Sequence, residues 1–411
     1  MKQRLSPGLL KRIVVCGIIG TLVTVGSVQA IYNPTQLPDP SRRWSVSVAA
    51  RQGYDDNVYT TENNKQGSST TLVEPQLLVN FPQDQTFIGL RYTYDMTYYW
   101  DRQNNNADQS HALDLLMSHR FNSRVSLDIN ETLRRGLDPK VVELFSGVPL
   151  LQRDQDDFWY NALSCGLTYN FSRRWLATLT QSWEHWAHDN AAVADISDYD
   201  AYRTTVSAIY SLNPSTSLGF NYQYNLTDYT DPGVSNVRDF ESHSAYLSLT
   251  HQFNPQLSLQ LAGGATLGVF SDHHDVSPYA TASISYNYAP GSTVSAGLVY
   301  SLTASQVGGY RASDTLSLNG QIAHRITPKF RATLSVAYVL YSLRDLYPTD
   351  PPSTLPAQMD ETAVQLGAGL SYNFTRWFSA DVNYSFDSVS SNLGGLAFDR
   401  NRVNAGIRLT Y

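Results

Sequence analysis

The sequence is poor in cysteine, with only two among 411 residues. Cys16 lies in an N-terminal segment that we expect to be removed, so Cys165 is left alone in the mature chain. One thiol cannot form an internal disulfide. Cys165 falls on the apolar face of its predicted strand, where we expect it to act as a small hydrophobic side chain.

Charged residues are also few, at 16%, and lysine is scarce, whereas Gly, Ser, Thr, Asn and Tyr are abundant. This composition favours strands and turns over helices. Removal of residues 1–30 takes away four basic residues and no acidic one, which leaves 25 Lys+Arg against 36 Asp+Glu and a net charge of −11. A nucleic-acid partner requires a basic surface, so this balance argues against one.

A long apolar run, Ile13 to Gly26, occurs near the N-terminus. Four basic residues precede it, and Val28-Gln29-Ala30 fits the small-residue pattern of a cleavage site. We therefore expect residues 1–30 to be a secretory signal peptide that is cleaved near Ala30 after Sec-type export. A membrane anchor is the alternative, but the run is shorter than the ~20 residues that a spanning helix needs.

The sequence instead shows strict alternation of apolar and polar residues, most clearly at its C-terminal end. Every second residue is apolar, and the residues between them are mostly polar. This period is typical of a strand whose two faces meet different surroundings. The terminal pattern resembles the signal that the barrel-insertion machinery of the outer membrane reads, carried here by Val403, Ala405, Ile407, Leu409 and Tyr411.

The same alternation recurs along the chain. In 216–228 one face carries Leu and aromatic residues and the other Ser, Gly, Asn and Gln, and 86–100 and 377–388 follow the same rule. A soluble sandwich also alternates, but its polar face is rich in Lys and Glu. Here the polar face is small or carries Arg and Asp, and the apolar face is rich in Tyr, as in the aromatic girdles of membrane barrels.

Short turns alternate with long polar stretches, and the turns recur every 35 to 50 residues along the sequence. Eight short turns, with both ends of the chain on their side, predict about 18 strands, within a range of 16–18. The predicted strands are 43–53, 70–81, 86–100, 110–121, 124–134, 157–171, 174–187, 200–212, 216–228, 240–253, 257–270, 277–288, 292–304, 312–326, 329–342, 361–374, 377–388 and 398–411.

These features predict an all-β fold, a transmembrane antiparallel up-and-down β-barrel with short periplasmic turns and long outer loops. Only a closed sheet pairs every backbone group in hydrocarbon without helices. We expect residues 31–42 to be a periplasmic N-terminal segment and residues 43–411 to form the barrel. A β-propeller is the soluble alternative, but each repeat is simpler to interpret as two long strands than as four short ones.

Three motifs carry a resemblance to a known family. They are the segment Gly53–Tyr59 and the hairpins Leu167–Trp175 and Leu370–Trp377. With these the chain resembles the Gram-negative outer-membrane barrels of the β-barrel porin-2 type, some of which are encoded beside exopolysaccharide genes. The resemblance implies a bacterial outer-membrane location, and it brings no catalytic motif with it.

Sequence motifs for chemistry are weak. His185 and His188 are three residues apart, which on a strand places them on opposite faces and makes them a poor metal pair. His273 and His274 lie in a polar loop, and Asp154, Asp156, Asp157, Asp228, Asp231 and Asp239 fit solvated loop acids better than calcium ligands. We therefore expect no enzyme activity, no catalytic residues, no metal site and no cofactor.

The charged residues of the polar face are the candidate lining of a pore. They are Arg43, Arg51, Glu74, Arg91, Asp95, Asp114, Asp128, Arg402 and Arg408. Either these charges pair across strands and stabilise the wall, or they form a transverse field that favours polar solutes.

The function that we expect is passive diffusion of small hydrophilic solutes through an outer-membrane channel. Export or assembly of an exopolysaccharide is one alternative, and an outer-membrane enzyme or structural barrel is another. The expected partners are outer-membrane lipid, the insertion machinery, and small hydrophilic solutes or polysaccharide.

Overall fold

The structure, a computed structural model, describes residues 42–103, 105–137, 156–230, 238–270, 272–305, 307, 309–346, 355–392 and 397–411. The predicted signal peptide and residues 31–41 of the predicted N-terminal segment lie outside the described residues. The described residues form 18 strands and one seven-residue helix, α2 (Ala191–Ser197).

The strands follow one another along the sequence with bounds close to those predicted. They are β1 (Trp44–Asp55), β2 (Ser68–Pro82), β3 (Thr86–Tyr99), β4 (Ala107–Arg120), β5 (Val125–Gly136), β6 (Phe158–Asn170), β7 (Trp175–His188), β8 (Tyr199–Asn213), β9 (Thr216–Tyr229), β10 (Phe240–Asn254), β11 (Leu257–Val269), β12 (His274–Ala289), β13 (Ser292–Ala304), β14 (Tyr310–Arg325), β15 (Phe330–Leu346), β16 (Gln358–Asn373), β17 (Phe378–Ser391) and β18 (Phe398–Thr410).

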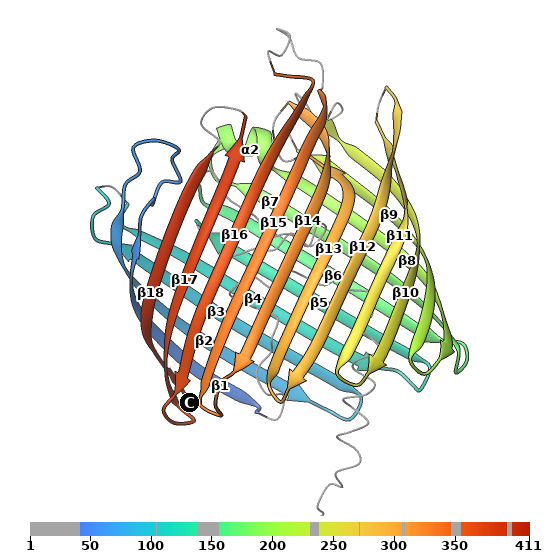
Figure 1. Cartoon of the computed structure of the whole chain (residues 1–411), viewed down its shortest axis with the longest axis horizontal. Helices are drawn as coiled ribbons and strands as arrows, with labels where there is room; N and C mark the ends of the chain where they lie inside the picture. The colour runs from blue at the N-terminus through green and yellow to red at the C-terminus, as the bar shows by residue number, and fades with distance from the viewer. Residues whose placement is uncertain are drawn as a thin grey trace, which may run out of the picture.

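Each strand pairs antiparallel with its neighbour in the sequence, and β18 pairs with β1. We call the β1–β18 junction the seam. Its ladder runs from Ser47 opposite Thr410 to Asp55 opposite Arg402. The sheet is therefore closed, and the strands cross the barrel wall at a common tilt (Figure 1). The predicted fold, a closed up-and-down β-barrel of about 18 strands, is confirmed.

The predicted and observed strands differ only at their ends. The interval 292–304 matches β13, whereas 329–342 is four residues shorter than β15 at its C-terminal end. The helix α2 was not predicted, and it lies in the loop between β7 and β8. Among the described residues, no helix is long and apolar enough to span a membrane.

The two faces of the wall differ as the alternation predicted. In β1, Trp44, Val46 and Val48 are exposed on the outer surface, while Ser45 and Ser47 are buried on the inner one. Aliphatic and aromatic side chains remain exposed around the outer surface on other strands as well. Such a surface suits contact with hydrocarbon rather than water.

The described residues form no single hydrophobic core, because many of the side chains buried on the inner face of the sheet are polar. Buried apolar residues instead form four small clusters near the ends of the strands that join the long loops. In one of them the rings of Phe158 and Trp186 stack with centroids 4.8 Å apart, and Tyr160 packs against Trp186.

The two ends of the barrel are unlike each other. The short turns and the C-terminus lie at the lower end of Figure 1, and the long loops and α2 lie at the upper end. We call these the short-turn end and the long-loop end. In several short turns, the side-chain oxygen of the first turn residue accepts backbone N–H groups two and three residues later, as Ser172 does from Arg174 and Trp175.

Candidate functional site: the inner wall

The inner wall carries a group of paired charges at the seam. Arg51 on β1 donates from Nε to Asp381 on β17 at 2.7 Å and from Nη1 to Glu74 on β2 at 3.4 Å. Arg408 on β18 donates from Nη2 to the other oxygen of Glu74 and from Nη1 to Ser47 at 3.1 Å. Glu74, with a side chain 2% exposed, therefore lies between two arginines.

A glycine allows this group to form. Gly406 on β18 lies opposite both Arg51 and Asp381, so the arginine side chain must cross it to reach the carboxylate. A Cβ at Gly406 would lie 2.1 Å from the Ala50 carbonyl oxygen and 2.5 Å from Cγ of Arg51. Only glycine leaves the room that this contact between β1 and β17 needs.

A second charged group lies on β3, β4 and β5. Asp114 accepts from Arg91 Nη2 at 2.8 Å and from Arg134 Nη2 at 2.6 Å, and Thr132 donates to it at 3.2 Å. One carboxylate thus bridges two guanidinium groups on the strands that flank it. Nearer the long-loop end, Arg402 donates to Asp387 at 2.6 Å.

The remaining predicted pore-lining residues are Asp95, Asp128 and Arg43. Asp95 is buried on the inner face of β3, opposite Ser110. Asp128 lies on the inner face of β5, opposite Ser118 and Gly166. Arg43 is exposed just before β1, where its carbonyl accepts the N–H of Asn80.

Taken together, these contacts support the alternative in which charges pair across strands. Their partners Asp381, Asp387 and Arg134 were not among the predicted pore-lining residues. All three could have been found by extending the alternation along each strand, because each lies at an inner-face position of its strand. Which acid meets which arginine is a property of the closed barrel.

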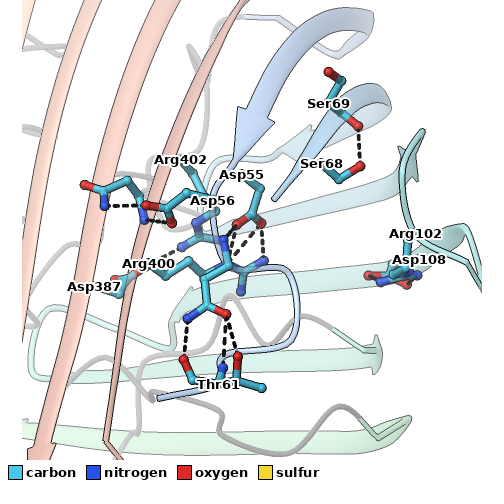
Figure 2. A network of polar contacts seen from close by, with 12 residues as sticks. Asp55, Asp56, Thr61, Ser68, Ser69, Arg102, Asp108, Asp387, Arg400 and Arg402 are labelled. Carbon is cyan, nitrogen blue, oxygen red and sulfur yellow. Dashed lines mark hydrogen bonds and ion pairs between the residues drawn. The ribbon is translucent and has the colours of Figure 1, made fainter. Parts of the chain in front are cut away.

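The motif at Gly53–Tyr59 holds the long-loop end of the seam together. Asp55 accepts hydrogen bonds from Arg400 at 3.0 and 3.1 Å, and Figure 2 shows the two side chains facing each other beside Arg402. Asp56 accepts from the backbone and side chain of Asn401 at 2.6 and 2.7 Å. We call these contacts of Asp55 and Asp56 with β18, together with those of Asn57, the clasp.

Asn57 completes the clasp. Its amide group donates to the Asp399 carbonyl at 2.9 Å and to the Thr61 carbonyl at 2.8 Å, and its Oδ1 accepts from the Thr61 N–H at 3.0 Å. The first long loop is therefore tied to the last strand by three consecutive side chains.

Away from the seam, in the region of β10–β14, the long-loop end of the wall turns inward. The ladder between β12 and β13 extends only to Ala280 opposite Tyr300, so the ends of these strands separate. Beyond that point Leu302 and Ala312 pack against Phe240 and Phe270 of the β10–β12 region. Because Phe240 belongs to the inner face of β10, the ends of β13 and β14 lie inside the wall there and occupy part of the mouth.

Polar contacts hold this inward end in place. Ser277 on β12 donates to Asp314 on β14 at 2.6 Å, and Tyr229 donates to the Ser305 carbonyl at 2.8 Å. Arg311 donates to Asp272 at 2.6 Å. Hydrogen bonds from His273 and then Arg311 lower the pKa of Asp272 to about 2, so this carboxylate is ionised at neutral pH.

The histidines singled out in the sequence have separate partners. His185 lies 3.0 Å from Asp200, and His188 lies 2.7 Å from Asp198. Asp156 accepts the N–H of Asn190 at 2.9 Å, while Asp154 and Asp231 lie outside the described residues. In the part of the chain that the structure describes, no group of three or more His, Cys, Asp or Glu residues could hold a metal ion.

Comparison with known proteins relates the C-terminal part of the chain to a family. Residues 261–411 match the family model described as “Putative beta-barrel porin 2”. The match runs from within β11 to the last residue and includes the hairpin Leu370–Trp377, so the resemblance noted in the sequence is confirmed. No curated protein matches the sequence.

The chain aligns with several solved structures over most of its length. The outer membrane protein OpdK of Pseudomonas aeruginosa is 13% identical, with 90% of this chain and 99% of that chain covered and a TM-score of 0.44. OccK2 (OpdF) of the same organism, in complex with glucuronate, is 14% identical, with 89% and 98% covered and a TM-score of 0.46. The siderophore receptor PirA of P. aeruginosa is 10% identical, with 91% and 81% covered and a TM-score of 0.42.

Proposed function

We propose that this chain, whose residues 261–411 match the β-barrel porin-2 family, is a porin-like channel for small hydrophilic solutes in the bacterial outer membrane. The observation that carries the proposal is the closed 18-stranded sheet with an apolar outer surface and a polar, charged inner wall. A barrel of this size is wide enough for an aqueous lumen, unlike one of eight strands. The family's description names a porin, which supports a channel over exopolysaccharide export or an enzymatic or structural barrel.

The proposed route to the membrane begins with Sec-type export and cleavage near Ala30. The insertion machinery then engages β18, whose outward side chains Val403, Ala405, Ile407 and Leu409 are exposed. In the membrane, the short-turn end faces the periplasm and the long-loop end faces the outside, as in other bacterial barrels.

The inner wall passes polar solutes because it offers hydrogen-bonding groups without a large net field. Arg51, Arg408 and Glu74 neutralise one another in part, and Asp114 does the same for Arg91 and Arg134. Paired charges of this kind hold water and orient dipoles, while they bind no single ion tightly. The inward ends of β13 and β14 then narrow the outer mouth.

The test is conductance in a planar lipid bilayer. Purified protein that migrates as a folded, heat-modifiable band is expected to give stepwise openings, and the same sample unfolded by boiling before addition is the control. Folded protein that inserts and never conducts would contradict the channel. The reversal potential in a salt gradient then measures the selectivity that the inner charges impose.

A further inference from the structure

The short turns share one backbone frame but carry different charges. In five of them, an Asn, Ser or Thr oxygen accepts N–H groups from the residues two and three positions later, as Asn122, Asn254 and Thr375 do, and Asn213 accepts from Ser215. Four turns of this frame carry cations at their tips: Arg124; Arg173 and Arg174; Lys329; and Arg376. The turns at 213–216 and 254–257 have none.

Three of the cationic segments are also variants of one short motif. Ser-Arg-Arg-Trp occurs at 41–44 and again at 172–175, and Thr-Arg-Trp occurs at 375–377. Each motif ends at the start of a strand that runs toward the long-loop end, namely β1, β7 and β17. In each motif, an Arg therefore lies next to a Trp at the short-turn end of a strand. The Cζ atom of Arg376 lies 5.2 Å from the ring centroid of Trp377.

The cations at this end are exposed and have no acidic partner. The group comprises Arg42, Arg43, Arg120, Arg124, Arg173, Arg174, Arg325, Lys329, Arg331 and Arg376, and none of them forms an ion pair with the described residues. These turns also contain one acidic side chain, Asp84 in the turn between β2 and β3. The arginines of the inner wall, such as Arg51 and Arg91, are paired instead. Ten unpaired cations at one end of an acidic protein form a surface that suits an anionic partner.

The neighbouring aromatics indicate where that partner lies. Trp44, Trp175 and Trp377 are each about half exposed on the outer surface. Tryptophan at the end of a membrane-spanning strand marks the headgroup level of the bilayer. The arginine next to it is then level with lipid phosphates, which guanidinium groups bind through paired hydrogen bonds.

We propose that anionic phospholipids bind at the short-turn end of the barrel. Their headgroups contact the Arg-Trp motifs at the start of β1, β7 and β17 and the cations of the neighbouring turns. The proposal rests on the membrane placement of the barrel given above. Binding is one-sided, because the turns β8–β9, β10–β11 and β12–β13 carry no charge. The anionic lipids gather along the arc that runs from β14 through the seam to β7.

The experiment measures which lipids remain bound to the folded barrel. The protein is reconstituted into vesicles of phosphatidylethanolamine and phosphatidylglycerol, extracted, and analysed by native mass spectrometry. We expect phosphatidylglycerol to exceed its share in the vesicles, by up to about fivefold for each basic residue at the surface. The triple change Arg173→Gln, Arg174→Gln and Arg376→Gln is expected to return the bound lipid toward the vesicle composition.

The matched variants use the shared turn frame. Ser215→Arg with Gln256→Arg adds cations to two neutral turns and is expected to increase bound phosphatidylglycerol. Lys65→Gln removes an exposed cation at the long-loop end and is expected to change nothing. All variants must keep the heat-modifiable band. This is expected of the turn variants because the side chains that hold these turns, Ser172, Asn213, Asn254 and Thr375, are unchanged.

Three outcomes would overturn the proposal. They are wild-type protein that binds the two lipids in the vesicle ratio, a triple variant that keeps its phosphatidylglycerol, and displacement of that lipid by inorganic phosphate at equal concentration, which would indicate a site for a soluble anion. Conductance of the same samples separates this proposal from the channel. A conducting barrel without lipid preference contradicts only the lipid sites, and a silent barrel that retains phosphatidylglycerol contradicts only the channel.

Discussion

At the scale of single residues, the inner wall depends on one carboxylate and one glycine. Glu74 is almost fully buried and accepts from both Arg51 and Arg408. Gly406 lets Arg51 continue past β18 to Asp381. Removing one member of a buried charge group leaves the others uncompensated, which costs more than the intact group contributes.

Removal of the basic and of the acidic side chains of the inner wall is expected to shift the ion selectivity of the channel in opposite directions. Replacing Arg51, Arg402 and Arg408 together with Gln should shift the reversal potential toward cations, because Glu74, Asp381 and Asp387 lose their partners. Glu74→Gln should shift it toward anions for the converse reason and should destabilise the barrel by about 3 kcal/mol. Unchanged selectivity in both variants would show that these charges stabilise the wall and do not act on solutes.

Gly406→Ala is expected to weaken the barrel, because the added methyl group would collide with the Ala50 carbonyl and with Arg51. Overpacking of this kind costs roughly 1–3 kcal/mol. The matched control is Gly263→Ala on β11, where a Cβ would meet nothing within 4 Å. Urea titration of the heat-modifiable band compares the two, and equal midpoints would contradict the account of Gly406.

At the scale of elements, each face of β18 has a role of its own. Its inner face supplies Arg402 and Arg408 to the wall, and its outer face supplies the proposed insertion signal. The strand ends in a reciprocal pair of backbone hydrogen bonds between Tyr411 and Val46, of 2.8 and 3.1 Å. The ring of Tyr411 lies 5.6 Å from that of Trp44 across the seam.

Changes on the outer face of β18 are expected to block assembly. Deletion of Tyr411, or Ile407→Asp with Leu409→Asp, should sharply reduce folded protein in the outer membrane, since charge on the lipid face is unfavourable and the terminal pattern is lost. Thr410→Asp is the control, because residue 410 lies on the inner face. Normal amounts of heat-modifiable protein after the outer-face changes would argue against the signal.

At the scale of the whole molecule, the ends of the barrel differ in loop length and in charge. Acidic residues are frequent at the long-loop end, and unpaired basic residues collect at the short-turn end. The two ends can therefore be told apart. In the proposed orientation, the long-loop end faces the outside of the cell and the short-turn end faces the periplasm.

Single cysteine substitutions test the orientation of the barrel in the outer membrane. On a Cys165→Ser background, Asn106→Cys in the loop between β3 and β4 should react with a membrane-impermeant thiol reagent in intact cells. Ser123→Cys and Asn254→Cys, both in short turns, should react only after the outer membrane is permeabilised. Labelling of position 254 in intact cells would invert the orientation.

Much of the fold could be predicted from the sequence because strand signals are local. Alternation at 216–228 and the turn at 254–257 each depend on a few adjacent residues, and a closed sheet follows once every strand has an apolar outer face. The predicted strand number therefore agrees with the structure, and each predicted boundary lies within four residues of the observed one. The helix α2 escaped prediction because seven residues in a polar loop carry too little periodicity.

The sequence by itself determined which residues face inward, so Arg51, Glu74 and Arg408 could be named as candidates without any coordinates. Only the tertiary structure decided their partners. Arg51 meets Asp381, 330 residues away, because closure of the seam sets β1, β18 and β17 in one register, and a shift of one residue would turn Arg51 outward. The inward ends of β13 and β14 likewise depend on a ladder that stops at Tyr300, and no local pattern encodes where two strands separate.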